Sequence, residues 1–336
     1  MNALDLHRSL LTLDTHVDIP WPSNPDPFEE TRRKVDLPKM LRGGMAGACF
    51  VAYVPQAARD VETDAAAYAR ALAMLDAIAG MARSERGITA VLATSAEAIE
   101  GARRDQVIAI VPAVENGFAI GADLSRLARF RALGAVYLTL THNGHNALAD
   151  SANPRADLGD AEAEHGGLSA LGRAAIAEMN RLGMLVDIAH VSRDAMLQAA
   201  GCSRSPVLST HSCIRALCDH PRNLDDGQLD ALRDVGGVAQ VTAVSAFLKK
   251  DAKPDQVGVG DFADHIDHAV RRIGVEHVGI SSDFDGGGGF RGWKDASEGP
   301  NITAELVRRG YGRAELGLLW GGNFLRVLRR AEALAG

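Results

Sequence analysis

The segment NRLGMLVDIAH, residues 180–190, contains a joint that indicates the fold class. A helical pattern ends, Gly183 follows, and an apolar run begins directly after it. Glycine is common at this position because it adopts positive φ at little cost and so ends a helix. The same helix–glycine–strand joint occurs at 131–140, 233–241 and 271–280. Its repetition predicts parallel strands that are connected by helical crossovers.

Eight short apolar runs have the character of strands that are buried on both faces. They are nearly continuous rather than alternating, and amphipathic helical patterns separate most of them. We expect one of these helices to begin with a capping box formed by Thr94 and Glu97. The predicted strands are residues 10–16, 47–53, 107–115, 135–142, 184–190, 205–211, 237–244 and 277–283.

Eight such strands in 336 residues predict an α/β fold, a (β/α)8 TIM-type barrel with inserted loops. The polar and proline-rich stretches between the periodic segments are short, so we predict one domain over residues 1–336. An open doubly wound sheet is the alternative. It fits less well because the first strand leads directly to Pro20 rather than to a glycine-rich phosphate loop.

The composition excludes several classes of protein. Acidic residues (43) outnumber basic ones (36), which disfavours nucleic acid as a partner because phosphate binding needs a basic field. No stretch resembles a membrane span, and MNALDLHRSL at the start has no apolar signal core, so we expect no membrane partner and a cytoplasmic location. A homodimer is one open alternative for the assembly. The four cysteines, which form no CxxC and predict no disulfide framework, are Cys49, Cys202, Cys213 and Cys218.

Polar residues gather where the predicted strands end. The carboxyl ends of the strands of a parallel barrel share one face, where the sites of this fold lie. A single histidine at a strand end is more often a hydrogen-bonding residue than a ligand, but burying seven such groups unpaired would cost several kcal/mol. The set therefore predicts a metal site: His16, Asp18, Glu115, His142, His190, His211 and Asp283.

The residue types also indicate which metal. Imidazole nitrogens and carboxylate oxygens suit Zn²⁺, and less well Mn²⁺, Fe²⁺ or Co²⁺. The number of ligands, with a carboxylate able to bridge, suggests two ions about 3.5–4 Å apart. Among the other histidines, we expect His265 and His268 on the surface of a helix, whereas His145 and His220 are close enough in sequence to support the site.

At this point the sequence resembles a known family, the membrane (renal) dipeptidase family of zinc peptidases, a branch of the amidohydrolase-type barrels. The resemblance covers nearly the whole chain, and the order of its blocks is more specific than any one block. The blocks are DTHVDIP (14–20), VENG (114–117), YLTLTHNGHNALADS (137–151), VDIAHVS (186–192), THS (210–212), HPRNL (220–224), ISSDFDG (280–286) and GGNFLRV (321–327).

The resemblance implies a role for each residue of the site. It implies a single metal-dependent hydrolase domain with two zinc ions, one held by His16 and Asp18, the other by His190 and His211, with Glu115 bridging both. It further implies that His142 lies over the substrate carbonyl, that Arg222 binds the substrate carboxylate, and that Asp283 is the general acid and base.

The sequence departs from the family pattern at four positions. Asn116 stands where glycine usually follows the bridging glutamate, and Val17 stands where asparagine is common. Ala243 and Val244 stand where the family commonly has an aromatic pair, so we expect an aromatic wall of the pocket to be missing. None of these departures removes a ligand, but the last puts the side-chain preference in doubt. Membrane attachment, known for mammalian members, is not carried over.

The resulting hypothesis is a zinc-dependent dipeptidase whose small dipeptide substrate is attacked by a metal-bridging hydroxide. His142 would stabilise the oxyanion, and Asp283 would pass the proton to the leaving amine. The resemblance suggests tolerance of a D-residue at the carboxy-terminal position. Two alternatives remain: another amidohydrolase-type hydrolase of small amides or lactones, although the HxH start common there is absent, and a non-catalytic binding protein on the same scaffold.

Overall fold

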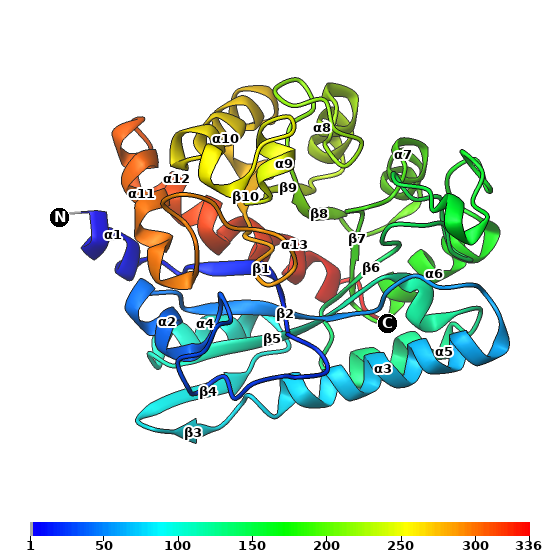
Figure 1. Ribbon diagram of the computed structural model, residues 1–336, viewed down its shortest axis with the longest axis horizontal. Helices are drawn as coiled ribbons and strands as arrows, with labels where there is room; N and C mark the ends of the chain where they lie inside the picture. The colour runs from blue at the N-terminus through cyan, green and yellow to red at the C-terminus, as the bar shows by residue number, and fades with distance from the viewer. Residues whose placement is uncertain (1–2) are drawn as a thin grey trace.

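A computed structural model describes residues 3–336 and shows the predicted barrel (Figure 1). Residues 1 and 2 of the predicted domain lie outside the described part. The eight predicted strands are present, all parallel and hydrogen-bonded in sequence order around the sheet. They are β1 (Leu13–Asp18), β2 (Gly47–Tyr53), β5 (Ile108–Glu115), β6 (Tyr137–Thr139), β7 (Leu185–Asp187), β8 (Leu208–Ser212), β9 (Val238–Val241) and β10 (Val278–Ile280).

The sheet closes at the carboxyl ends of its first and last strands. Val17 of β1 forms a parallel bridge with Phe284, which follows β10. Asp18 N donates to Phe284 O at 3.0 Å, and Asp283 N donates to His16 O at 3.1 Å. Closure therefore places the HVD segment of β1 directly beside the SDFD segment, although almost the whole chain separates them.

A small hairpin was not predicted. It consists of β3 (Ser84–Glu85) and β4 (Ile88–Leu92), which pair antiparallel. β4 also pairs in parallel with residues 108–110 of β5, whereas β6 pairs with the other end of that strand. The hairpin thus extends the sheet at the amino-terminal side of the barrel, away from the predicted site. Its alternating exposure, with few buried positions, explains why it lacks the continuous apolar signal of the other strands.

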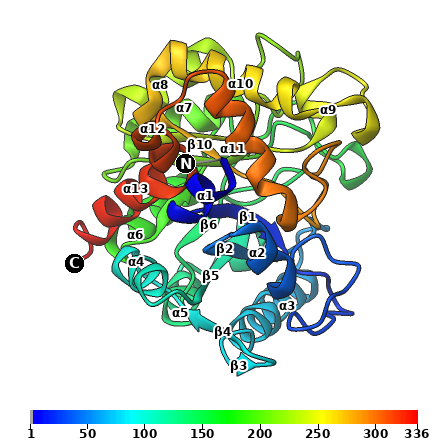
Figure 2. The ribbon, with the colours of Figure 1, turned by 90° about the vertical axis from the view of Figure 1, so that its left-hand side faces the viewer.

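Helices surround the strands on the outside, as the two perpendicular views show (Figure 2). They are α1 (Ala3–Ser9), α2 (Leu37–Gly43), α3 (Val61–Ala79), α4 (Ala96–Arg104), α5 (Ser125–Ala132), α6 (Ala170–Arg181), α7 (Arg193–Cys202), α8 (Asp226–Asp234), α9 (Ser245–Leu248), α10 (Val259–Ile273), α11 (Gly299–Arg308), α12 (Arg313–Gly317) and α13 (Asn323–Glu332). Within residues 3–336, none of them combines the length and apolar character needed to cross a bilayer.

The glycines of the four joints have the expected backbone conformation. Gly134, Gly183, Gly236 and Gly274 all have positive φ, between 67° and 98°. The predicted capping box is wrong, however: α4 is capped by Ser95, whose side chain accepts from Ala98 N. β6, β7 and β10 are also shorter than the predicted runs, because in each the chain leaves the sheet before the polar residue that ends the run.

Candidate metal centre

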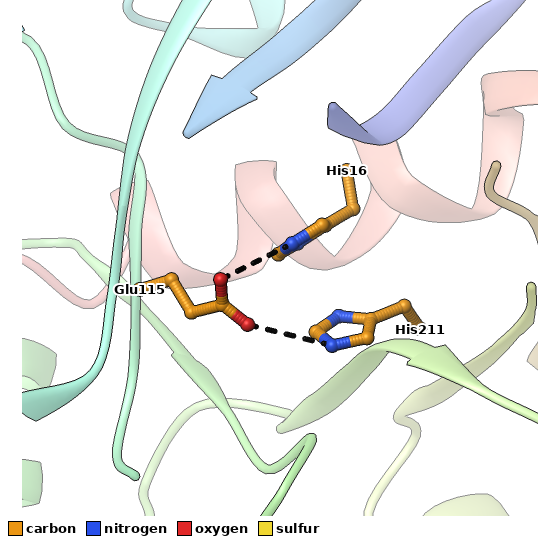
Figure 3. Close-up of side chains that lie close together, drawn as sticks. All are labelled: His16, Glu115 and His211. Atoms are coloured by element: carbon orange, nitrogen blue, oxygen red, sulfur yellow. Dashed lines mark ion pairs between the residues drawn. The ribbon is translucent and has the colours of Figure 1, made fainter. Parts of the chain in front are cut away.

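The predicted ligands meet around Glu115, at the end of β5 (Figure 3). Glu115 Oε2 lies 3.6 Å from His16 Nε2, and Oε1 lies 3.5 Å from His211 Nε2. His190 Nε2 is 3.2 Å from the same Oε1 and only 2.9 Å from His211 Nε2. The two carboxylate oxygens of Glu115 therefore face different histidines: His16 on one side, and His190 with His211 on the other.

Three overlapping groups of side chains have ligand atoms within 4.8 Å of one another. Glu115 belongs to two of them, and His16 also belongs to two. The groups are His16, Glu115 and His211; Glu115, His142 and His190; and His16, Asp18 and Asp283. The structure thus brings together all seven polar residues that were predicted from the strand ends.

The hydrogen bonds of His16 orient its ring toward Glu115. Its Nδ1 lies 3.1 Å from the hydroxyl of Tyr137, and that hydroxyl donates to Thr15 O at 3.0 Å. Since the tyrosine proton is used in this way, its oxygen accepts from Nδ1–H of His16. When the ring is neutral, as a metal ligand must be, its lone pair is then on Nε2, the atom that faces the cluster.

His211 is oriented by an equivalent chain. Its Nδ1 lies 2.8 Å from Thr210 Oγ1, which donates to Asp187 Oδ2 at 2.7 Å. Thr139 Oγ1 donates to the same carboxylate oxygen at 2.6 Å. The Thr210 hydroxyl must therefore accept from His211 Nδ1–H, which again leaves Nε2 as the free lone pair.

His190 is held by the long loop that follows β6. Its Nδ1 lies 3.3 Å from Asn143 Oδ1, and Asn153 Nδ2 donates to that oxygen at 3.1 Å. Ser151 Oγ donates to His190 O at 3.2 Å. His190 has a φ of 67°, so these contacts fix a backbone conformation that is unfavourable for a non-glycine residue.

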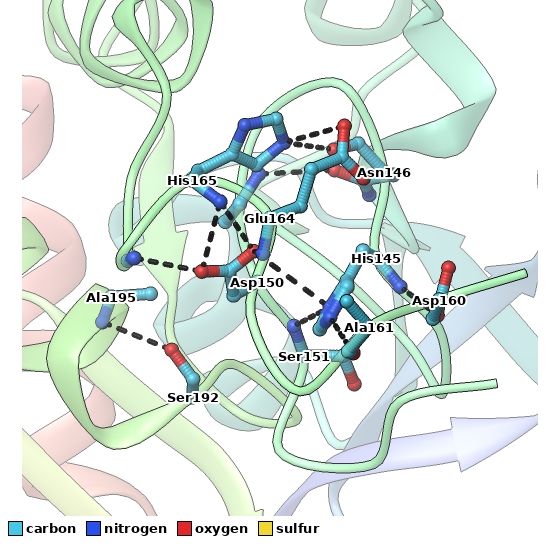
Figure 4. A network of polar contacts seen from close by, with 12 residues as sticks. His145, Asn146, Asp150, Ser151, Asp160, Ala161, Glu164, His165, Ser192 and Ala195 are labelled. Carbon is cyan, nitrogen blue, oxygen red and sulfur yellow. Dashed lines mark hydrogen bonds and ion pairs between the residues drawn. The ribbon is translucent and has the colours of Figure 1, made fainter. Parts of the chain in front are cut away.

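The same loop contains a network of polar contacts that fixes its shape (Figure 4). The Asp150 carboxylate accepts from the backbone N–H groups of Glu164, His165 and Gly167. Ser151 N donates to His145 Nδ1 at 2.9 Å. His145 therefore supports the loop that presents His142 and Asn143, and it does not line the cavity.

The electrostatics of the cluster favour a cation. Burial alone would lower the pKa of His16, but the Glu115, Asp283 and Asp18 carboxylates raise it to about 10. Burial raises the pKa of Asp283 to about 7, and it raises that of Asp18 well above its usual range, with Glu115 adding to both shifts. The carboxylates of Asp18, Glu115 and Asp283 thus repel one another, and a cation among them would relieve this repulsion.

Two buried atoms of the cluster are available to bind a metal ion. His16 Nε2 and Asp18 Oδ1 have no hydrogen-bond partner among the described residues. An unsatisfied buried group costs about 1–3 kcal/mol, and these two belong to one group of side chains whose ligand atoms lie within 4.8 Å of one another. A lone pair and a carboxylate oxygen are the donors that Zn²⁺ binds, so the residues present fit a metal centre.

The cluster forms the floor of a cavity of about 740 Å³. Arg222, which is buried, lies at its side, where Nη2 donates to His211 O at 3.3 Å and the guanidinium lies 5.3 Å from the centre of the Phe247 ring. Burial lowers the pKa of Arg222 to about 10, and its Nε has no partner in the described chain. A buried guanidinium with free donors is suited to bind a carboxylate.

Comparison with known proteins assigns the family. The description "Membrane dipeptidase (Peptidase family M19)" matches residues 1–336. The chain belongs to this family. It is 31% identical to dipeptidase verJ of Clonostachys rogersoniana, over 99% of this chain and 87% of that protein, and 33% identical to dipeptidase 3 of Rattus norvegicus, over 98% and 67%. The match to dipeptidase aclJ of Aspergillus oryzae is 39% identical over 66% of this chain and spans about half of that protein.

Solved structures of M19 dipeptidases share the fold. The probable dipeptidase PvdM from Pseudomonas aeruginosa superposes with a TM-score of 0.94 at 30% identity, covering 99% of this chain and 98% of that chain. A metallo peptidase from Rhodobacter sphaeroides, liganded with a phosphinate mimic of the dipeptide L-Ala-D-Ala, has a TM-score of 0.82 at 26% identity, covering 95% and 99%. The chain is thus a member of a family of metal-dependent dipeptidases.

Two expectations about individual residues of this M19 member are wrong. His265 is buried rather than on the helix surface: Ile214 N donates to its Nδ1 and its Nε2 donates to Leu248 O, so it joins α10 to the loop after β8 and to the end of α9. The aromatic wall is also not missing. Ala243 is buried, but Phe247, one turn beyond Val244, lines the cavity.

Several residues of the site were not predicted. Tyr53, Trp21 and Arg70 line the cavity, and none of them belongs to a motif with a known metal spacing. Tyr53 ends β2. Of the three, it is the one that the sequence could have indicated, because every other predicted strand that ends in a polar residue contributes that residue to the site. His220, considered as a supporting residue, lines the cavity and accepts from Arg222 N at 3.1 Å.

Proposed function

We propose that this chain is a zinc-dependent dipeptidase, built as one metal-dependent hydrolase barrel domain over residues 1–336. The arrangement of Glu115 carries the proposal, because its two oxygens face two separate sets of histidines. His16 and Asp18 would hold one zinc ion, His190 and His211 the other, and Glu115 would bridge them. When bound, the ions would polarise the scissile carbonyl and lower the pKa of a water.

Residues around the cluster would bind and orient the dipeptide. The buried Arg222 would hold its free carboxylate with charge-assisted hydrogen bonds. Burial lowers the pKa of His142, so its imidazole is neutral at neutral pH. A hydrogen bond from the Tyr53 hydroxyl, which lies 3.5 Å from His142 Nδ1, would place the ring proton on Nε2, where it can be donated to the developing oxyanion.

Asp283 would move the proton. It groups with His16 and Asp18 and lines the cavity, so a water held at the cluster and the leaving amine are both within its reach. Asp285, the other acid of this segment, accepts from Lys34 N and Val35 N and is therefore engaged in holding the loop after β1. This difference in partners favours Asp283 over Asp285 as the general acid and base.

The test is a small substrate panel with zinc-loaded protein. We expect about two bound ions per chain. We also expect hydrolysis of L-Ala-L-Ala or L-Ala-D-Ala, and much slower hydrolysis of the C-terminal amides and of tripeptides, because Arg222 requires a carboxylate next to the scissile bond. Absence of turnover on every dipeptide, or faster turnover of amides and lactones, would replace this proposal with another amidohydrolase-type activity.

A further inference from the structure

The cavity contains a second arginine that the proposed chemistry does not use. Among the described residues that line the cavity, Arg70 and Arg222 are the two with a permanent positive charge. A volume of about 740 Å³ is in the upper part of the range for sites of drug-sized ligands. The cavity therefore has room for a dipeptide with large side chains, and Arg70 lies where one of those side chains could extend.

Arg70 is fixed at one nitrogen and free at the other two. Its Nε donates to Tyr53 O at 3.0 Å, which ties the guanidinium of α3 to the end of β2. Within residues 3–336, its two terminal nitrogens make no hydrogen bond or ion pair. Arg59, near the start of the same helix, is instead paired through both terminal nitrogens with Glu164. A guanidinium that is fixed through Nε and has two free terminal nitrogens is preorganised to bind a carboxylate.

The order of strands places Arg70 across the cavity from Arg222. In the ring of eight strands, β2 and β8 are four positions apart and so lie on opposite sides of the barrel. Tyr53, the partner of Arg70, ends β2, whereas Arg222 is in the loop after β8 and contacts His211 O. The Glu115 cluster lies between them. A dipeptide with its carboxylate on Arg222 and its scissile bond over the cluster directs its amino-terminal residue toward Arg70.

The residues beside Arg70 are suited to contact the methylene groups of a substrate side chain. Met74 also lines the cavity and is four residues further along α3, so the two side chains share one face of the helix. Trp21, which follows β1, lines the cavity as well. Arg70 repels a positive charge, so the substrate ammonium is directed away from it.

We propose that Arg70 makes the enzyme selective for dipeptides whose amino-terminal residue has an acidic side chain. The inference rests on the proposed dipeptidase function. It assigns the free terminal nitrogens of Arg70 to the side-chain carboxylate of glutamate or aspartate, while Met74 and Trp21 pack against the methylene groups. The discriminating comparison is between a glutamyl and a glutaminyl dipeptide, which have nearly the same shape and differ in charge.

The experiment measures kcat/KM of the zinc-loaded enzyme for L-Glu-Ala and L-Gln-Ala, with the alanine enantiomer that the enzyme prefers. We expect wild type to favour the glutamyl peptide by roughly 10- to 100-fold, the worth of a charge-assisted hydrogen bond. This ratio should fall with rising ionic strength. It should approach one in Arg70→Met and in Arg70→Gln, the second of which retains a donor for Tyr53 O.

Arg126→Met is the matched control. Arg126 stacks on Tyr68 of α3, at 4.5 Å from the ring centre, and does not line the cavity, so its loss should leave the ratio unchanged. A wild-type ratio near one, or a ratio that persists in folded Arg70 variants, overturns the inference. Hydrolysis of L-Ala-Ala separates this outcome from failure of the proposed function, because a dipeptidase without acid selectivity still cleaves the neutral peptide. If both variants fail to fold, the wild-type ratio and its salt dependence decide.

Discussion

Replacing Thr210 by valine tests whether the hydrogen bond behind His211 controls metal affinity. The substitution keeps the shape but leaves His211 Nδ1–H, which is buried, without the oxygen that lies 2.8 Å away. Thr210 Oγ1 also lies 3.4 Å from His16 Nδ1, although Tyr137 remains as a closer partner for that ring. Loss of such a partner behind a metal-ligating histidine typically costs 10- to 100-fold in affinity, or about 1.4–2.8 kcal/mol.

Thr139→Val is the matched control for this prediction. Both threonines donate to Asp187 Oδ2, at 2.7 Å and 2.6 Å, but Thr139 contacts no histidine of the cluster. Each variant should lose a similar free energy of unfolding, roughly 1–2 kcal/mol, from the lost hydrogen bond. Zinc affinity, measured by competition with a chromophoric chelator, should fall about 10- to 100-fold for Thr210→Val and much less for Thr139→Val. Equal zinc affinities for the two variants would refute the reasoning, because Asp187 alone would then account for the effect.

Three further predictions concern the site, and a fourth concerns His7 of α1. Glu115→Gln should lower zinc occupancy on both sides of the cluster, since its two oxygens face different histidines; elemental analysis showing loss of only half the metal would contradict bridging. Asp283→Asn should lower kcat on the order of 10²-fold or more with near-normal zinc content, and normal turnover would place the base elsewhere. Arg222→Met should lower kcat/KM for dipeptides by roughly 2–5 kcal/mol and abolish discrimination against dipeptide amides, whereas equal losses on both substrates would make Arg222 structural. Burial lowers the pKa of His7 from 6.5 to about 4. The free energy of unfolding should therefore fall as the pH decreases from 6.5 to 4, because in this window the unfolded chain binds a proton that the folded chain does not. The contribution of His7 to this loss, up to ~3 kcal/mol in chemical denaturation, should be absent from His7→Gln.

The barrel and the grouping of the candidate ligands were predictable because both depend on local patterns. Apolar runs bounded by glycine joints specify parallel strands. A polar residue at the end of such a run therefore lies at the carboxyl-terminal face of the barrel. His16, Glu115 and His211 could therefore be assigned to one site from position alone. The residues that orient them could not be assigned, since Tyr137 and Thr210 lie within the apolar runs themselves and have no distinctive spacing.

Contacts between distant segments limit what the sequence reveals. His265 has the helical spacing of a surface residue, but the loop after β8 and the end of α9 cover it. Only the tertiary structure shows that backbone groups of these two segments bind both of its ring nitrogens. Phe247 supplies an aromatic surface from a short helix after β9 rather than from the strand where the family usually has it. In both cases the sequence showed the residue type but not which other parts of the chain the residue lies against.

Strained backbone conformations occur at several positions of the site. Asn116, His190, Asp283 and Asp285 are non-glycine residues with φ between 56° and 83°, and each follows a strand that contributes to the cluster. Their cost, of order 1–3 kcal/mol each, is offset by bonds made at those positions. Asn116 donates to Val54 O and accepts from Phe118 N and Asn146 Nδ2, while Asp283 O accepts from three consecutive glycine N–H groups. Asn116, where we expected the family to have glycine, is thus stabilised by its own side chain, so the turn after Glu115 tolerates a positive φ at a residue other than glycine.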